Sequence, residues 1–249
     1  MVIFPHGETN VTLACQNRCV SCNHFIPVQS PWFVKPETLE RDLNTAAKIV
    51  HFNVYNLVGG EPTLHPHILD LLDIVNASGI SSRTEITSNG QGAQRWSDDF
   101  YRKIDDLIIT PYKLSSDERQ HITNKCADFG VSLEWHPVIF TWAGYKQEQS
   151  AESAAELYRD CWYRRNRNVI DEGYFYRCCI GRFTPSILMG LEKEHDGILL
   201  DGLTEEALIN YLGQEETPDA CLKCAGNRGA RIPWREQTDP AKWIEESLG

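Results

Sequence analysis

Cys15-Gln-Asn-Arg-Cys19-Val-Ser-Cys22 is the stretch around which this chain is organised. It places three thiols at Cys-x3-Cys-x2-Cys spacing, directly after an apolar run at residues 11–14 that predicts a short strand. A loop at the end of a strand can bring three thiolates to one point, and thiolates suit zinc or iron–sulfur clusters. With no fourth Cys or His at the usual local spacing, one coordination position stays open, which indicates chemistry at the metal. The alternative is a structural zinc knuckle completed by His24 or by a distant cysteine.

The composition is that of a soluble globular protein. The 249 residues suffice for one barrel-sized domain, or one domain with a small appendage, and the net charge is −11. Because no long Lys/Arg run is present, we expect no nucleic-acid partner. We also expect neither a membrane segment nor a signal peptide, and a cytoplasmic location. In a reducing cytosol, nine cysteines indicate metal binding or catalysis before disulfides.

Strand-like and helical runs alternate from about residue 10 to residue 145. Such alternation predicts an α/β fold with parallel strands and helices outside them, in a barrel or an open sheet, with the active site at the carboxyl ends of the strands. The expected strands cover residues 53–58, 84–87, 106–110 and 131–136, and the expected helices cover residues 37–50, 67–78, 98–104 and 117–129.

The pattern changes after residue 150. We predict helices at 151–159 and 204–212, and a last helix that Asp239 caps and Pro240 opens. Residues 168–178 predict a β-hairpin that turns at Asp171-Glu-Gly173. We therefore divide the chain into a core at residues 1–150 and a smaller α+β domain at residues 151–249.

Two further loops follow predicted strands, at Gly59-Gly60-Glu61-Pro62 and at Thr87-Ser88-Asn89-Gly90. Each is ordinary turn chemistry when taken alone. Together with the three cysteines, and in this order, they resemble the radical S-adenosylmethionine (SAM) family over residues 10–145. The resemblance implies that the core is a partial (β/α)6 barrel with the three loops at one face.

The resemblance also implies a role for each loop. Cys15, Cys19 and Cys22 would hold a [4Fe–4S] cluster, and the amino and carboxylate groups of SAM would chelate its fourth iron. An electron from the cluster would cleave SAM into methionine and a 5′-deoxyadenosyl radical, which removes a hydrogen atom from the substrate.

The remaining contacts with SAM follow from the same resemblance. Gly59 and Gly60 lack a Cβ, so the backbone can come close to the methionyl amino group, from which Glu61 would accept a hydrogen bond. Ser88 and Asn89 would lie near the ribose or the carboxylate. The aromatic residue that the family usually has before the third cysteine is Ser21 here. The adenine contact would therefore fall to Phe25 or His24.

A second cysteine set lies in the C-terminal part. Cys161-x11-Gly173-x4-Cys178, followed by Cys221-x2-Cys224, resembles the shortened "twitch" form of the SPASM domain, which holds one auxiliary [4Fe–4S] cluster with four protein ligands. Cys178 rather than Cys179 has the matching spacing, and neighbours on a strand point to opposite faces. The alternative is a zinc ribbon with the same four cysteines.

The remaining candidates would act on the substrate. Cys179 would either pack against the cluster or donate a hydrogen atom, as radical epimerases of this family require. Tyr112, Glu134 and His136 lie at predicted strand ends, where they would face the substrate or serve as satisfied structural groups. Cys126 lies in a predicted helix and is expected in the core.

The resemblance favours a small-molecule enzyme of the 2-deoxy-scyllo-inosamine dehydrogenase type. It would oxidise or epimerise a carbinol carbon of a sugar, an aminocyclitol or a nucleoside-like compound, with the auxiliary cluster as electron acceptor. A flavodoxin or ferredoxin reductase would supply the electron that cleaves SAM. One alternative is a maturase that modifies a ribosomal peptide. Another is a zinc-stabilised binding module, which would leave the Gly-Gly-Glu-Pro and Ser-Asn-Gly loops without a role.

Overall fold

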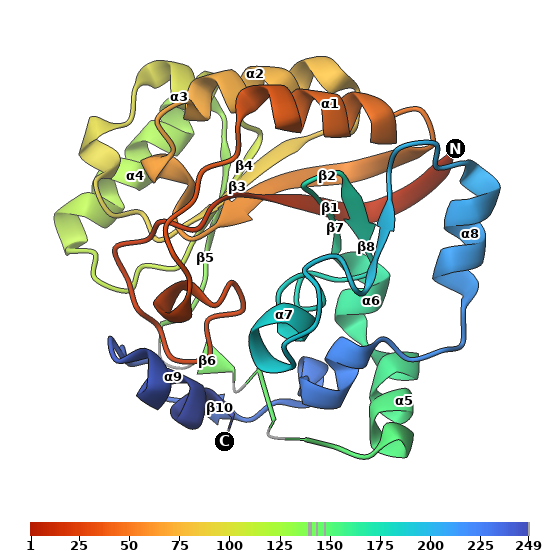
Figure 1. Ribbon diagram of the computed structural model, residues 1–249. Coiled ribbons are helices and arrows are strands. Elements are labelled where there is room, and N and C mark those ends of the chain that lie inside the picture. Colours follow the sequence, from red (N-terminus) through yellow and green to blue (C-terminus); the bar gives the residue numbers. More distant parts are fainter. Residues whose placement is uncertain (139–140, 143, 147, 249) are drawn as a thin grey trace.

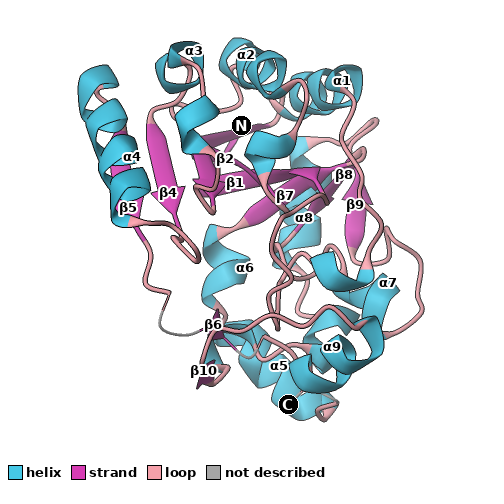
Figure 2. Cartoon of the chain, turned by 90° about the vertical axis from the view of Figure 1, so that its left-hand side faces the viewer, coloured by secondary structure: helices cyan, strands magenta, loops and turns pink. Residues whose placement is uncertain are grey.

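The fold is an α/β layer structure in which helices cover one face of a mostly parallel sheet (Figures 1 and 2). This computed structural model describes residues 1–138, 141–142, 144–146 and 148–248. Within these residues, eight strands form one sheet in the order β5-β4-β3-β2-β1-β7-β8-β9, and β6 and β10 form a separate ribbon. The strands are β1 (Val2–Thr12), β2 (Val50–Gly59), β3 (Thr84–Ser88), β4 (Asp106–Ile109), β5 (Ser132–Trp135), β6 (Thr141–Trp142), β7 (Asn168–Asp171), β8 (Tyr174–Tyr176), β9 (Gly197–Leu199) and β10 (Arg231–Ile232).

The predicted α/β alternation is confirmed, because β1 to β5 pair in parallel and helices connect most of them. The helices are α1 (Pro36–Ala46), α2 (Ile68–Ser78), α3 (Asp98–Arg102), α4 (Ser116–Phe129), α5 (Ala151–Asp160), α6 (Trp162–Asn166), α7 (Thr184–Leu188), α8 (Glu205–Gly213) and α9 (Pro240–Ser247). No helix in the described ranges has the length and apolar character that a bilayer crossing requires.

Strand β1 is longer than the sequence suggests. The apolar run at residues 11–14 predicts a short strand, whereas β1 already begins at Val2. Pro5 argues against a strand because it lacks an N–H donor. It is tolerated here because β7 pairs with β1 only at Gly7 and Glu8, so β1 has no partner on that side at Pro5.

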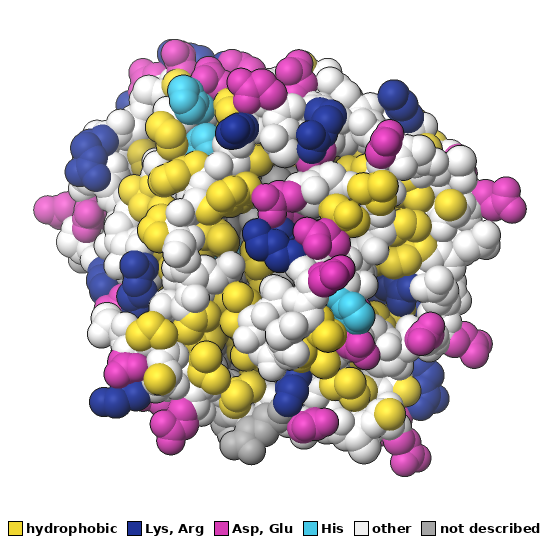
Figure 3. Space-filling model, in the orientation of Figure 1, with side chains coloured by type: hydrophobic (Ala, Val, Ile, Leu, Met, Phe, Trp, Pro, Cys, Tyr) yellow, Lys and Arg dark blue, Asp and Glu magenta, His cyan; other side chains and the backbone are white. Residues whose placement is uncertain are grey.

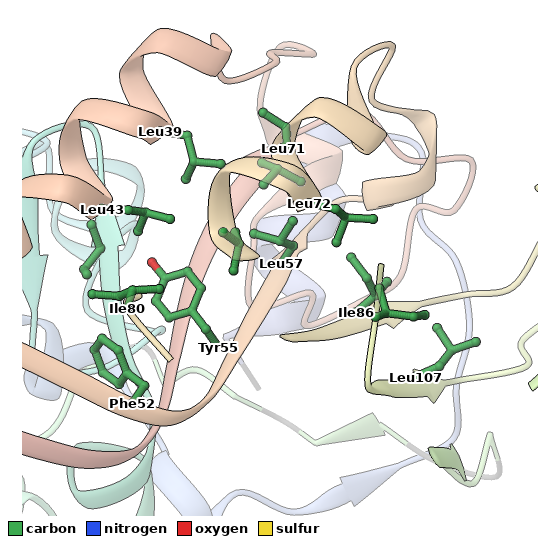
Figure 4. Packing of buried hydrophobic residues seen from close by; sticks show 14 of the residues in the cluster. Leu39, Leu43, Phe52, Tyr55, Leu57, Leu71, Leu72, Ile80, Ile86 and Leu107 are labelled. Carbon is green, nitrogen blue, oxygen red and sulfur yellow. The ribbon is translucent and has the colours of Figure 1, made fainter. Parts of the chain in front are cut away.

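The larger hydrophobic core lies between the sheet and helices α1 and α2 (Figure 4). Leu39 and Leu43 on α1 and Leu71 on α2 point toward Tyr55 and Leu57 on β2, and all five are almost completely buried. Each fully buried side chain of this size contributes about 1.5–3 kcal/mol to folding. This packing fixes which face of each strand looks outward to the helices, so the intervening residues face the concave side.

The sixth parallel strand is β7, which lies beside β1 on the side away from β2. β7 and β8 form the predicted hairpin, and β9 pairs with β8. The turn is left-handed at Glu172 (φ 48°) and Gly173 (φ 86°), and the Gly173 N–H donates to Asp42 Oδ2 on α1 at 2.8 Å. Three strands from beyond residue 150 therefore extend the sheet of the core. A separate domain at residues 151–249 stays a prediction.

Candidate functional site

The Cys15–Cys22 loop begins where β1 ends. The Thr12 side chain and the Leu13 N–H both donate to the carbonyl of Trp32, at 2.7 and 2.8 Å, which closes the base of the loop. The pKa of the Cys15 thiol is raised to about 11 and that of Cys22 to about 12, mainly by burial and in part by the neighbouring thiols. The three sulfurs thus lie in one water-poor region, where a metal rather than water would stabilise the thiolates.

The two glycines of the Gly-Gly-Glu-Pro loop allow it to touch the cysteine loop. A Cβ on Gly59 would come within 2.2 Å of the Thr12 carbonyl oxygen, and one on Gly60 within 2.2 Å of the Ala14 oxygen. The N–H of Gly60 donates to Thr12 O at 2.7 Å, and that of Glu61 donates to Ala14 O at 2.8 Å. Here the missing side chains make room for the cysteine loop itself.

Glu61 joins the second loop to the third. Its carboxylate is completely buried and accepts hydrogen bonds from Ser88 Oγ and from the Asn89 N–H, both at 2.7 Å. It also accepts from Thr63 Oγ1 at 2.7 Å. Burial raises the pKa of Glu61, and these hydrogen bonds oppose that shift. Both carboxylate oxygens therefore already have protein partners, and a bond from a SAM ammonium to Glu61 stays a prediction.

The third loop returns to the cysteines through Asn89. Its side-chain amide donates to Gln16 Oε1 at 3.0 Å and makes a long contact of 3.9 Å with Cys15 Sγ. Gln91 likewise donates to the Asn17 side chain at 3.1 Å. The three loops predicted to meet at the carboxyl ends of β1, β2 and β3 are thus in direct contact.

The two residues proposed for the adenine contact are engaged with other groups. Phe25 is fully buried, with its ring centroid 4.6 Å from that of Tyr145 and 5.6 Å from that of Trp243. An adenine contact would require the Phe25 ring to leave this packing. The His24 ring nitrogen Nδ1 lies 2.8 Å from Asn10 Oδ1, and burial lowers the pKa of His24 to about 4.

The second cysteine set surrounds a cavity of its own. Cys161, Cys178, Cys221 and Cys224 all line it, together with apolar and aromatic side chains. Backbone N–H groups already donate to two of the sulfurs, from Gly181 to Cys178 at 3.3 Å and from Gly226 to Cys224 at 3.1 Å. Four converging thiols with N–H donors form a donor set that fits an iron–sulfur cluster.

The spacing of the side chains bears on the zinc alternatives. Within the described part of the chain, no three Cys, His, Asp or Glu side chains are grouped closely enough to ligate a single metal ion. Zinc holds its thiolates at about 2.3 Å and therefore needs such a close group. Neither cysteine set, in the residues that the structure describes, is therefore arranged as a preformed site for a single zinc ion.

The concave face of the sheet carries charged residues that the sequence patterns did not single out. Glu8, Asn56 and Glu85 sit side by side in register on β1, β2 and β3, and Arg167 Nη1 lies 3.8 Å from Glu8 and 3.6 Å from Glu85. Burial raises the pKa of both glutamates to about 7, and Arg167 opposes the shift. The Asn56 oxygen is buried without a hydrogen-bond partner.

Cys179 is buried in an apolar cluster with Tyr176 and Phe183, while its neighbour Cys178 lines the four-cysteine cavity. The pKa of Cys179 is raised well above its usual value by burial and by the charge of nearby Glu8, and Arg167 opposes that shift. Both cysteines lie in the bend and turn that follow β8, which ends at Tyr176, so the strand alternation expected for this pair does not apply.

The strand-end candidates separate into two locations. Tyr112 lies by the cysteine loop, where burial and the three thiols raise its pKa, and its ring packs against that of Trp234, with centroids 5.1 Å apart and a tilt of 31°. Glu134 on the outer strand β5 and His136 just after that strand pair with each other at 2.9 Å, and their side chains are 66% and 44% exposed. No hydrogen bond or ion pair between described residues joins those two to the cysteine loop.

A pocket of about 470 Å³ opens beside the cysteine loop. Leu13 and Trp32, at the two ends of that loop, line it together with Asp171, Arg182 and Phe183. On the face drawn in Figure 3, charged side chains gather near the centre among hydrophobic ones. The volume lies in the usual range for small-molecule sites.

Apolar alternation gave no signal for Glu8 or Glu85, because Glu8 lies between Gly7 and Thr9, and Glu85 lies between Thr84 and Ile86. Arg167 and Trp234 carried no such signal, since both lie far along the chain from the groups that they meet.

Comparison with solved structures supports the fold. The chain is similar to the crystal structure of BtrN in complex with AdoMet and 2-DOIA, with a TM-score of 0.53 and 14% identity over 88% of this chain and 84% of that chain. A selenomethionine form of BtrN in an open conformation matches with a TM-score of 0.51 and 13% identity over 95% of this chain and 97% of that chain. SuiB of Streptococcus suis bound to S-adenosylmethionine matches with a TM-score of 0.47 and 13% identity over 84% of this chain and 66% of that chain. No protein-family model and no curated protein matches the sequence. At these identities, the two BtrN comparisons show a shared fold.

Proposed function

We propose that this chain is a radical SAM enzyme that acts on a small polar molecule. One observation carries the proposal: the loops after β1, β2 and β3 are joined into one unit. Gly60 and Glu61 bind the backbone of the cysteine loop, and Glu61 binds Ser88 and Asn89. A structural metal knuckle would need only the cysteine loop. BtrN, with which the chain shares its fold, was crystallised with AdoMet.

Cys15, Cys19 and Cys22 would hold a [4Fe–4S] cluster with one open iron, and Cys161, Cys178, Cys221 and Cys224 an auxiliary one. When bound, the first cluster supplies the electron for the reductive cleavage of SAM, and the auxiliary cluster accepts an electron from the substrate. The protein's part is to bind and orient the substrate and to exclude water. The buried surroundings of the thiols and the apolar lining of the second cavity serve that purpose.

The charged concave face supports a polar substrate such as a sugar, an aminocyclitol or a nucleoside-like compound. Glu8, Asn56 and Glu85 present acceptor oxygens to hydroxyl or amino groups, and Arg167 limits the repulsion between the two carboxylates. The reaction we propose is oxidation or epimerisation of a carbinol carbon. Cys179 lies next to this layer, where an epimerase would place its hydrogen-atom donor.

Anaerobic reconstitution tests the proposal. The wild-type chain is expected to bind about eight irons, two [4Fe–4S] clusters, and to form 5′-deoxyadenosine from SAM with dithionite. Cys19→Ala should retain about four irons and form no 5′-deoxyadenosine. Cys126→Ala, at a buried cysteine outside both sets, should keep all eight irons.

Several results would contradict the proposal. Zinc in place of iron would refute it, as would full iron retention by Cys19→Ala. Turnover of a peptide, with none of polyols or aminocyclitols, would instead favour the peptide-modifying alternative.

A further inference from the structure

The C-terminal segment 231–247 is bound along the Cys15–Cys22 loop, although more than 200 residues separate the two in sequence. The Val20 N–H donates to the carbonyl of Arg235 at 3.0 Å, and the Gln237 N–H donates to that of Arg18 at 2.9 Å. These antiparallel bonds place Glu236 opposite Cys19. In Figures 1 and 2, β10 and α9 lie at the end of the molecule away from α1 and α2.

Two tryptophans of this segment meet at Cys19. Trp243 is fully buried and donates its indole N–H to the Cys19 carbonyl oxygen at 2.7 Å. Trp234 donates its indole N–H to the Cys19 sulfur at 3.2 Å. The Trp234 ring is also held against Tyr112, and Lys113 next to Tyr112 pairs with Glu236 at 2.7 Å. The contact with Tyr112 and the nearby Lys113–Glu236 ion pair therefore hold the Trp234 indole in place.

Cys19 has a shorter side-chain hydrogen bond to its sulfur than Cys15: Trp234 Nε1 lies 3.2 Å from Cys19 Sγ, whereas Asn89 Nδ2 lies 3.9 Å from Cys15 Sγ. The Cys15 sulfur accepts from the backbone N–H of Asn17, within its own loop, at 3.4 Å. Cys19 instead accepts from a side chain that the fold brings in from the far end of the chain. The indole N–H is a donor only, so the direction of this hydrogen bond is fixed.

A donor at a ligand sulfur stabilises the more negative charge of a reduced cluster, and hydrogen bonds to sulfur are a known determinant of cluster potential. We infer that Trp234 is a positioning residue that raises the reduction potential of the cluster held by Cys15, Cys19 and Cys22. This inference rests on the proposed function. The C-terminal segment would thus regulate how readily an external one-electron donor reduces that cluster.

Trp234→Phe tests the inference, because phenylalanine keeps the ring against Tyr112 and removes the N–H. The measurement is an anaerobic redox titration of the reconstituted full chain, followed by electron paramagnetic resonance. Added SAM identifies the signal of the cluster with the open iron. We expect the midpoint of that signal to become more negative by about tenfold in the one-electron equilibrium, or about 59 mV, with the midpoint of the auxiliary cluster unchanged.

Trp243→Phe is the matched control, since it removes an indole hydrogen bond to the same residue but to the backbone oxygen. We expect lower thermal stability with no shift of the midpoint. An unchanged midpoint in Trp234→Phe, with its iron retained, would overturn the inference, and so would equal shifts in both variants. A wild-type chain that binds no iron would overturn the proposed function, which is a different result.

Discussion

At the scale of single residues, Glu61 and Gly60 contact protein groups that their sequence motif does not predict. The resemblance predicts a hydrogen bond from SAM to Glu61, whose oxygens also accept from Ser88, Asn89 and Thr63. It predicts that Gly60 lets the backbone approach SAM, and the missing Cβ of Gly60 also makes room for the Ala14 carbonyl. Residues of a motif that is predicted to bind a ligand can therefore also hold the neighbouring loops together.

We predict that Gly60→Ala disrupts the contact between the first two loops. The new Cβ would lie 2.2 Å from a backbone oxygen, so the loops must separate. Overpacking of this kind costs about 1–3 kcal/mol. Urea unfolding of the metal-free chain measures that cost, and reconstituted iron should fall by about four per chain.

Gly213→Ala is the control for this substitution, because nothing lies within 4 Å of a Cβ there. It should change stability by less than about 0.5 kcal/mol. Equal stability of the two variants would argue against the close approach of the loops.

Glu8 gives a prediction for pH. Burial raises its pKa from 4.5 to about 7, so between those values the folded chain binds more protons at this site than the unfolded chain. Stability from this group is therefore full below about pH 4.5 and is lost as the pH rises to 7. We expect Glu8→Gln to be about 1–3 kcal/mol more stable than the wild type above pH 7, with little difference near pH 4.5.

Denaturant unfolding of both proteins at several pH values measures this difference. Glu40→Gln, at an exposed position on α1, should show no such divergence. A constant difference between Glu8→Gln and the wild type across the pH range would contradict the prediction.

At the scale of elements, the β7–β8 hairpin is held to β1 by a buried polar chain. Asp171 Oδ2 accepts from Arg182 Nε at 2.9 Å and from Asn10 Nδ2 at 3.1 Å, and Asp171 and Arg182 are both about 97% buried or more. Burial raises the pKa of Asp171 to about 6, while Arg182 opposes the shift. The hairpin turn was predictable from Asp-Glu-Gly, but its attachment to β1 was not.

We predict that Arg182→Met destabilises the chain by about 3–5 kcal/mol at pH 8, because it leaves Asp171 buried without its cation. Adding Asp171→Asn in the same chain should recover a large part of this loss, since no charge then remains. Guanidinium unfolding curves of both variants test the pair. A double variant no more stable than Arg182→Met would show that the ion pair is not the cause.

At the scale of the whole molecule, the four-cysteine cavity joins segments that are distant in sequence. Its lining comes from α5, from residues near β8 and from the loop that contains Cys221 and Cys224. A cluster bound there would link these segments, and a ligand that binds only the folded state raises its stability.

We predict that Cys221→Ala loses about four irons and melts at least about 2–4 °C below the wild type when both are reconstituted, which corresponds to about 1 kcal/mol. With iron removed by a chelator, the two proteins should melt at nearly the same temperature. A difference that persists without iron would mean that Cys221 acts through packing alone.

Patterns in the sequence were enough to predict the α/β alternation, the hairpin turn and the three loops after β1, β2 and β3. These features follow from local rules: apolar periodicity, turn residues and short cysteine spacing. They suffice to bring Gly60, Glu61 and Asn89 to one end of a parallel sheet.

The groups that surround those loops became known from the folded chain. Folding placed β7 beside β1, Arg167 between Glu8 and Glu85, and Trp234 at the Cys19 sulfur. Each of these pairs lies more than 80 positions apart in the chain, and each side chain is unremarkable within its own segment. Such contacts depend on which surfaces face one another once the core has packed. A pattern within one segment cannot predict which distant segment will lie against it.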